Sequence, residues 1–113
     1  MHKTLRNKYF KHDLYVGDDA WYTNLIDDLD SVASYIDANS KLYIALTDFL
    51  DDLELNVERY DGHISVSELE SLKRFISLIC ADGVQILPED LAHLHQHIYT
   101  IDSVIEQHIM GKA

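Results

Sequence analysis

Cysteine, proline, glycine and basic residues are all scarce in this chain of 113 residues. Cys80 is the only cysteine, so an intramolecular disulfide is excluded and a reducing, cytoplasmic setting is expected. Its place at the end of the apolar run Phe75–Cys80 favours a small buried side chain over a reactive thiol. No apolar run reaches the roughly 18 residues that a transmembrane helix requires, and no apolar stretch follows the basic N-terminus as in a signal peptide.

The few helix-breaking residues divide the chain into blocks of helical length. They are one proline and four glycines, at Pro88, Gly17, Gly62, Gly83 and Gly111. Within the blocks, apolar residues recur at intervals of three and four, which predicts four helices. Their expected ranges are about 18–38, 41–59, 67–81 and 88–110. Four amphipathic helices with short connections predict an all-α fold, a compact antiparallel bundle.

Local signals indicate where these helices begin. Asp18 and Asp19 suit the N-cap and the first turn of the first helix. Ser67 is followed three residues later by Glu70, which is the spacing of a capping box. Pro88 suits the first turn of the last helix, where a backbone N–H is not needed.

The segment before the first helix has a different character. Residues 1–17 are expected to form a basic N-terminal arm or a short helix, and residues 18–113 a single helical bundle domain. The aromatic side chains of the arm, Tyr9, Phe10 and Tyr15, are expected to pack against the bundle.

Charge is distributed unevenly along the chain. Residues 1–11 carry four of the nine basic side chains and no acidic one, whereas all 20 acidic side chains follow them, for a net charge of −11. The negative electrostatic field of such a chain repels nucleic acids and anionic membranes and attracts basic surfaces. The charge therefore predicts a basic protein as partner, with no direct nucleic-acid ligand and no membrane.

The acidic residues are densest between Asp13 and Asp61. This stretch contains 13 of them and only two basic residues, Lys41 and Arg59. Like charges one helical turn apart cost a few tenths of a kcal/mol per pair, and interspersed lysines would keep a chain equally soluble. Nearby tyrosines supply rigid aromatic anchors for a partner. The predicted partner-binding residues are Asp27, Asp28, Asp30, Asp48, Asp51 and Asp52, with Tyr22 and Tyr43 as anchors. A solvated acidic face with no partner is the alternative.

Catalytic and metal-binding patterns are weak. The chain has no glycine-rich phosphate loop, no nucleophile elbow and no Cys-x-x-Cys, so we expect no enzymatic activity and no cofactor. Glu89, His93 and His97 lie at intervals of four, which is compatible with a metal site on one helix face. The paired Glu-x-x-His motifs of a di-iron bundle are missing, so solvated histidines are favoured.

Charge and spacing together predict an acidic inhibitor that blocks a basic nucleic-acid-handling protein such as a nuclease. Immunity proteins and anti-defence proteins that imitate DNA are of this class, with carboxylates in place of phosphates. Two alternatives stay open. A structural or adaptor subunit would form a homodimer, or pair with another helix, through the apolar seam of residues 91–105. A helical metal- or small-molecule-binding protein would use the histidine-rich helix face.

Overall fold

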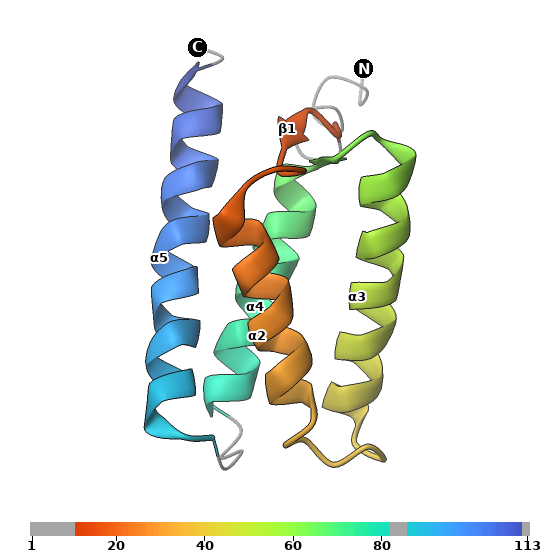
Figure 1. Cartoon of the computed structure of the whole chain (residues 1–113), viewed down its shortest axis with the longest axis vertical. Helices are drawn as coiled ribbons and strands as arrows, with labels where there is room; N and C mark the ends of the chain where they lie inside the picture. Colours follow the sequence, from red (N-terminus) through yellow and green to blue (C-terminus); the bar gives the residue numbers. More distant parts are fainter. Residues whose placement is uncertain (1–10, 82–85, 112–113) are drawn as a thin grey trace, which may run out of the picture.

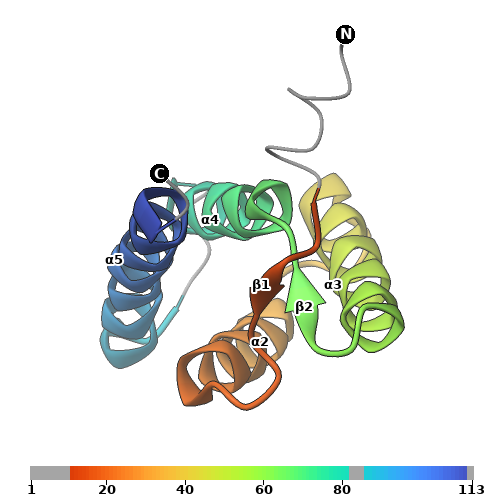
Figure 2. The ribbon, with the colours of Figure 1, turned by 90° about the horizontal axis from the view of Figure 1, so that it is seen from above.

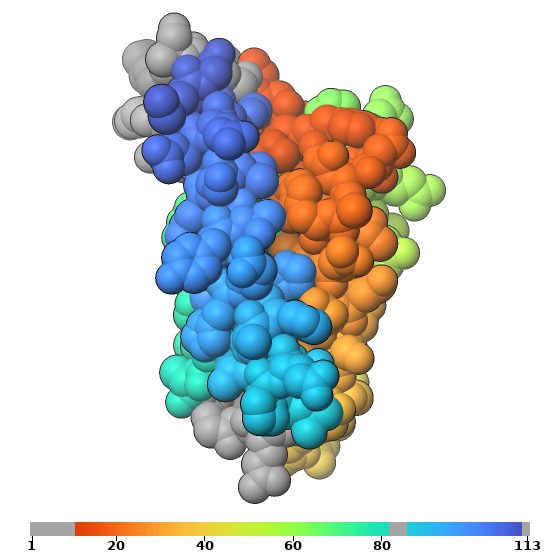
Figure 3. All heavy atoms as spheres, turned by 60° about the vertical axis from the view of Figure 1, so that its left-hand side comes forward, coloured from red at the N-terminus to blue at the C-terminus, as the bar shows by residue number. Residues whose placement is uncertain are grey.

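The computed structural model describes residues 11–81 and 86–111, and within them four helices pack as an antiparallel bundle (Figure 1). The helices are α2 (Ala20–Ala33), α3 (Lys41–Arg59), α4 (Val66–Ala81) and α5 (Pro88–Gly111). Seen from above, one helix stands at each corner of a quadrilateral, so α5 lies beside both α4 and α2 (Figure 2). The space-filling view shows α5 lying against α2 over one face of the molecule (Figure 3). The predicted all-α bundle is confirmed.

Two very short strands cross one end of the bundle (Figure 2). Strand β1 (Leu14–Tyr15) pairs in antiparallel fashion with β2 (His63–Ile64), which lies between α3 and α4. The described part of the N-terminal segment is therefore extended and tied to the bundle by backbone hydrogen bonds. Tyr9 and Phe10, which were expected to pack on the bundle, lie outside the described residues.

The turn that leads into β2 depends on a glycine. Asp61 and Gly62 have φ angles of 54° and 86°; aspartate tolerates the left-handed region, and glycine adopts it without strain. A Cβ atom on Gly62 would lie 2.8 Å from the ring of Tyr15 and 3.2 Å from the Cα of Gly17. The Gly62 carbonyl accepts a 2.8 Å hydrogen bond from the backbone N–H of Val16. The turn therefore lets the N-terminal segment approach closely enough to pair.

The core is aliphatic and lies along the axis between the four helices. Its fully buried side chains include Leu25, Leu29, Leu46, Leu53, Leu69, Leu72, Ile76, Ile79, Leu94 and Ile101. Burial of each such side chain contributes about 1.5–3 kcal/mol. Cys80 is partly buried against this core, and burial raises the pKa of its thiol. Within residues 11–81 and 86–111, no helix is long and apolar enough to span a membrane.

Helix α2 ends at Ala33, five residues before the expected boundary at residue 38. Beyond Ala33 the backbone hydrogen bonds span three residues instead of four. The Tyr35 N–H donates to the Val32 carbonyl, and the Ile36 N–H donates to the Ala33 carbonyl. This three-residue spacing belongs to turns rather than to an α-helix. Ile36 is nevertheless buried, so a turn residue continued the apolar periodicity and misplaced the predicted end.

The capping box of α4 lies two residues before the predicted one. The Ser65 Oγ accepts from the Glu68 N–H at 3.2 Å, and Glu68 Oε1 accepts from the Ser65 N–H at 2.9 Å. The prediction of Ser67 and Glu70 was therefore wrong. The pairs Ser65–Glu68 and Ser67–Glu70 have the same spacing in the sequence. The helix begins at the earlier pair because Val66 is buried in its first turn.

Candidate functional site

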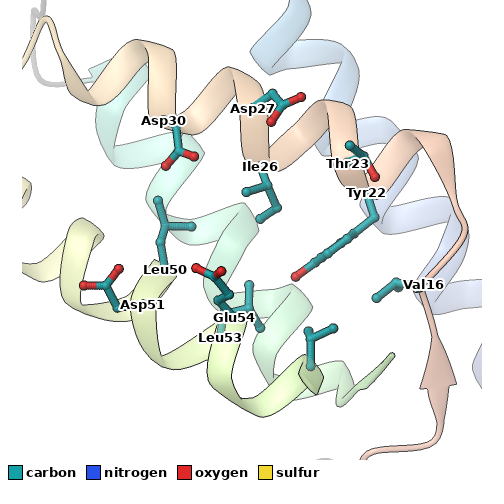
Figure 4. Close-up of a pocket in the computed structure, with 12 residues that line it drawn as sticks. Val16, Tyr22, Thr23, Ile26, Asp27, Asp30, Leu50, Asp51, Leu53 and Glu54 are labelled. Atoms are coloured by element: carbon teal, nitrogen blue, oxygen red, sulfur yellow. The ribbon is translucent and has the colours of Figure 1, made fainter. Parts of the chain in front are cut away.

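A groove of about 450 Å³ lies between α2 and α3 (Figure 4). Its floor is apolar and is formed mainly by Ile26 of α2 and by Leu50, Leu53 and Val57 of α3. These residues recur at helical spacing on the facing edges of the two helices, so the groove follows directly from the amphipathic pattern. Val16, which follows β1, lines the end of the groove that lies beneath the strand pair.

Carboxylates surround this apolar floor. Asp27 and Asp30 come from α2, and Asp51 and Glu54 come from α3. In each helix the two acids are three residues apart and so share one face. Among the described residues that line the groove, none is basic. We call this feature, with its four carboxylates and apolar floor, the acidic groove.

The electrostatics of the acidic groove favour a cation. Burial, followed by the neighbouring charges of Asp27 and Asp51, raises the pKa of Asp30 above its ordinary value. Burial, followed by the charges of Glu68 and Glu54, raises the pKa of Tyr22 from 10.0 to about 12. Burial is the larger cause of both shifts, and the smaller contribution from neighbouring carboxylates is repulsion that a positive charge in the groove would relieve.

Three of the predicted binding residues on α2 and α3, Asp27, Asp30 and Asp51, line the acidic groove together with the predicted anchor Tyr22. Figure 4 shows Asp30 and Asp51 near one end, while the Tyr22 ring reaches from α2 toward α3 beside Glu54. Glu54 was not among the predicted site residues. Its position three residues after Asp51 is the signal that would have placed it on the same helix face.

The other predicted binding residues lie elsewhere. Asp48 and Asp52 are exposed on α3 and do not line the acidic groove. Tyr43 is partly buried against the core in the first turn of α3, where its backbone N–H donates to the Ser40 side chain. Asp28 faces α5, where its Oδ2 accepts a 2.7 Å hydrogen bond from the Nε2 of His97.

The candidate metal ligands do not come together. Glu89 is exposed in the first turn of α5 and His93 is exposed one turn later, whereas His97 is buried and bonded to Asp28. His93 and His97 do line a second hollow with Asp28, between α2 and α5. Across residues 11–81 and 86–111, no group of three His, Cys, Asp or Glu side chains is arranged to hold a metal ion.

Two further histidine–carboxylate pairs hold the N-terminal segment. His12 Nε2 lies 3.1 Å from Glu68 Oε1, and its ring stacks on Tyr60 with a centroid distance of 3.9 Å. His108 Nε2 donates to Asp13 Oδ1 at 3.0 Å. These contacts join the segment before β1 to α4 and α5. His108 is thus partly buried beside a carboxylate.

The apolar seam predicted for α5 faces the interior of its own bundle. Leu94, Ile101 and Ile105 are buried against the other helices. The exposed apolar residues of α5 lie off this seam, with Tyr99 73% and Met110 66% exposed. A partner helix therefore could not use the whole seam without opening the bundle.

The chain was compared with protein-family models, with curated proteins and with solved structures, and none of the three comparisons found a match. No family therefore suggests a role for any residue. The acidic groove, built from two helices and lined by Asp27 and Asp30 of the predicted α2 acids, brings more of the predicted partner-binding residues together than the hollow between α2 and α5 does.

Proposed function

We propose that this chain is an acidic protein-binding inhibitor that blocks a basic, nucleic-acid-handling protein. The observation that supports this most directly is the acidic groove, in which four carboxylates from α2 and α3 gather around an apolar floor. Like charges so placed are unfavourable in the isolated chain and become favourable when a basic surface covers them.

The mechanism would be competition for a positively charged site. Asp30, Asp51 and Glu54 in the groove, with Asp48 and Asp52 exposed beside it on α3, would pair with arginine and lysine side chains that otherwise contact phosphates. Such pairing speeds association and makes it strongly dependent on salt. Inhibition then follows because the nucleic acid and this chain need the same basic residues.

The adaptor and metal-binding alternatives have less support. The α5 seam is occupied inside the bundle by residues such as Leu94 and Ile101, so oligomerisation would need a different surface. The histidine-rich face contributes His97 to a hydrogen bond with Asp28, which removes one of the three candidate ligands. The acidic groove needs no rearrangement before it can bind.

The test is a pull-down from nuclease-treated lysate of the native host, followed by a nucleic-acid competition assay on the captured protein. The variant Asp48→Lys/Asp51→Lys/Asp52→Lys reverses the charge of α3, and the matched control replaces the same three residues with glutamate. We expect the wild type and the glutamate control to capture a basic nucleic-acid-binding protein and to displace its nucleic acid. The lysine variant should do neither.

Two results would contradict the proposal. In one, the folded lysine variant captures the same protein as the wild type. In the other, the captured protein binds its nucleic acid equally well in the presence of a saturating amount of this chain. High salt should release the captured protein, because the pairing is electrostatic.

A further inference from the structure

We propose that the acidic groove receives one basic amphipathic helix of the partner, with an apolar side chain at the Val16 end and an arginine or lysine between Asp30 and Asp51. This inference rests on the proposed function and specifies what the groove recognises. It differs from a general acidic surface because it assigns the apolar floor and the carboxylates to different side chains of the same ligand helix.

The groove has two halves that differ in chemistry. Near β1 its lining includes Val16 and the Tyr22 ring, with Glu54 beside that ring, whereas Asp30 and Asp51 lie at the other end (Figure 4). A ligand that satisfies both halves must carry an apolar group and a cation on one face. A uniformly basic peptide would leave the apolar half exposed to water.

The length of the groove suits helical spacing. Along α2 its lining residues Tyr22, Ile26 and Asp30 lie at intervals of four, which corresponds to about 12 Å at the rise of an α-helix. Side chains two turns apart on a ligand helix, at i and i+7, share one face and are separated by about 10 Å along its axis. An apolar residue and a cationic residue at these positions can therefore reach the two halves at once.

The charge of the groove selects the cation. Asp30 is exposed, and partial burial followed by the charges of Asp27 and Asp51 raises the pKa of its carboxyl. A guanidinium or ammonium group between Asp30 and Asp51 would offset that repulsion. The aliphatic part of an arginine or lysine side chain would also cover the neighbouring Leu50.

Two other hollows lack this combination. The hollow between α2 and α5 is polar, and its Asp28 is already bonded to His97. The hollow between α3 and α4 is about 140 Å³ and pairs Phe75 and Leu78 with the cation Arg74. Neither hollow combines an apolar floor with several carboxylates that face a neighbouring helix.

The test uses two synthetic peptides of identical composition and charge. One places leucine and arginine at i and i+7 on the same helical face, and the other is scrambled so that they lie on opposite faces. Each labelled peptide is titrated with the protein, and binding is followed by fluorescence anisotropy at low salt. We expect the aligned peptide to bind at least about tenfold more tightly than the scrambled one.

Two pairs of variants locate the site. Asp30→Asn/Asp51→Asn removes two charges that line the acidic groove, whereas Asp48→Asn/Asp52→Asn removes two charges of α3 that do not line it, and all four residues are exposed. The groove pair should weaken binding of the aligned peptide by at least about tenfold, and the outer pair by less than about twofold. Circular dichroism of all variants checks that they are folded.

A third comparison tests the apolar floor without changing charge. Thr23, which is exposed at the edge of the groove, is replaced by tryptophan to fill it, and the exposed Ser103 of α5 is replaced by tryptophan as the control. Thr23→Trp should weaken binding of the aligned peptide several-fold, because the indole occupies the space that the ligand needs, and Ser103→Trp should not.

The outcomes separate this inference from the proposed function. Equal weakening by both asparagine pairs, or equal affinity for both peptides, would overturn the groove assignment while leaving a general acidic binding surface intact. Failure of the chain to capture a basic nucleic-acid-binding protein would overturn the proposed function. Selective loss with the groove pair and with Thr23→Trp would support the groove as the binding site.

Discussion

Aspartates on the two long flanks of α2 have different surroundings. On the closed flank, toward α5, Asp28 accepts a 2.7 Å hydrogen bond from the Nε2 of His97, and Leu94 and Ile101 pack nearby in the core. On the open flank, toward α3, Asp30 faces further carboxylates across the acidic groove. Both flanks contain a hollow, so closed and open refer here to the charges: on the closed flank an acid is paired with a donor, and on the open flank acids face acids.

This difference is the basis of the proposal that the open flank binds another molecule. Replacing one acid of the groove with lysine would raise the unfolding free energy of the isolated chain, because repulsion between like charges would become attraction. The closed flank shows that the fold can match an aspartate with a suitable donor. The unfavourable charge on the open flank is therefore consistent with a basic partner that is absent from the isolated chain.

The largest expected effect is a loss of unfolding free energy when the core packing of α5, on the closed flank, is disrupted. Ile101→Ala removes a fully buried side chain of α5 and should lower the free energy of unfolding by about 2–5 kcal/mol, through lost burial and the cavity left behind. Urea denaturation measures this change. Tyr99→Ala, at a position 73% exposed on the same helix, is the control and should stay within about 0.5 kcal/mol of wild type. A similar loss for both would argue against the packing described for α5.

The next effect tests the hydrogen bond of the closed flank. His97→Ala removes the donor to Asp28 and should cost about 1–2 kcal/mol of unfolding free energy. His93→Ala removes an exposed histidine one turn earlier on α5 and should cost less than about 0.5 kcal/mol. If thermal and urea denaturation show an equally negligible loss of unfolding free energy for His97→Ala and His93→Ala, the His97 hydrogen bond does not stabilise the packing of α2 against α5.

A smaller effect of opposite sign is expected on the open flank. Asp30→Asn should raise the unfolding free energy at neutral pH by a few tenths of a kcal/mol, because it removes repulsion from Asp27 and Asp51. The folded-state pKa of Asp30 is raised, so the ionised carboxyl destabilises the fold above that pKa and this penalty disappears below it. The advantage of the variant should therefore shrink as pH falls through the carboxyl range. A destabilised variant at neutral pH would contradict the account.

The smallest effect concerns Tyr22 beside the groove. Its pKa of about 12, against an ordinary value of 10.0, means that the neutral phenol is favoured in the folded state. Tyr22 should therefore contribute stability that is lost as pH rises toward 12. In an NMR titration, Glu54→Gln should lower the pKa of Tyr22 slightly, since the Glu54 charge contributes to the shift. A Tyr22 that ionises with an ordinary pKa would show that its ring is not buried there.

Much of the fold could be predicted because three of the four helices have uninterrupted apolar spacing. The bounds of α3 agree with the prediction, and α5 differs by one residue. The two-residue strands were not predicted, because Leu14–Tyr15 and His63–Ile64 are too short to show a period of two. The capping box was misplaced because two Ser-x-x-Glu pairs overlap, and the burial of Val66 decides between them.

The candidate site could be predicted in part. Helical spacing identified the acids of α2 and α3, but it did not reveal which flank each acid faces. Asp27 and Asp28 are adjacent, yet Asp27 lines both the acidic groove and the hollow toward α5, whereas Asp28 lines only that hollow and is bonded to His97. This distinction depends on the placement of α3 and α5 on opposite sides of α2. A sequence pattern along one helix does not contain that information.

The most direct test of the central claim is an amide NMR titration of the isotope-labelled chain with the aligned leucine–arginine peptide. The account predicts that chemical-shift changes concentrate around the open flank, from Tyr22 to Asp30 on α2 and from Leu50 to Val57 on α3. Changes centred on exposed residues of α5, or spread evenly over all acidic residues, would contradict it.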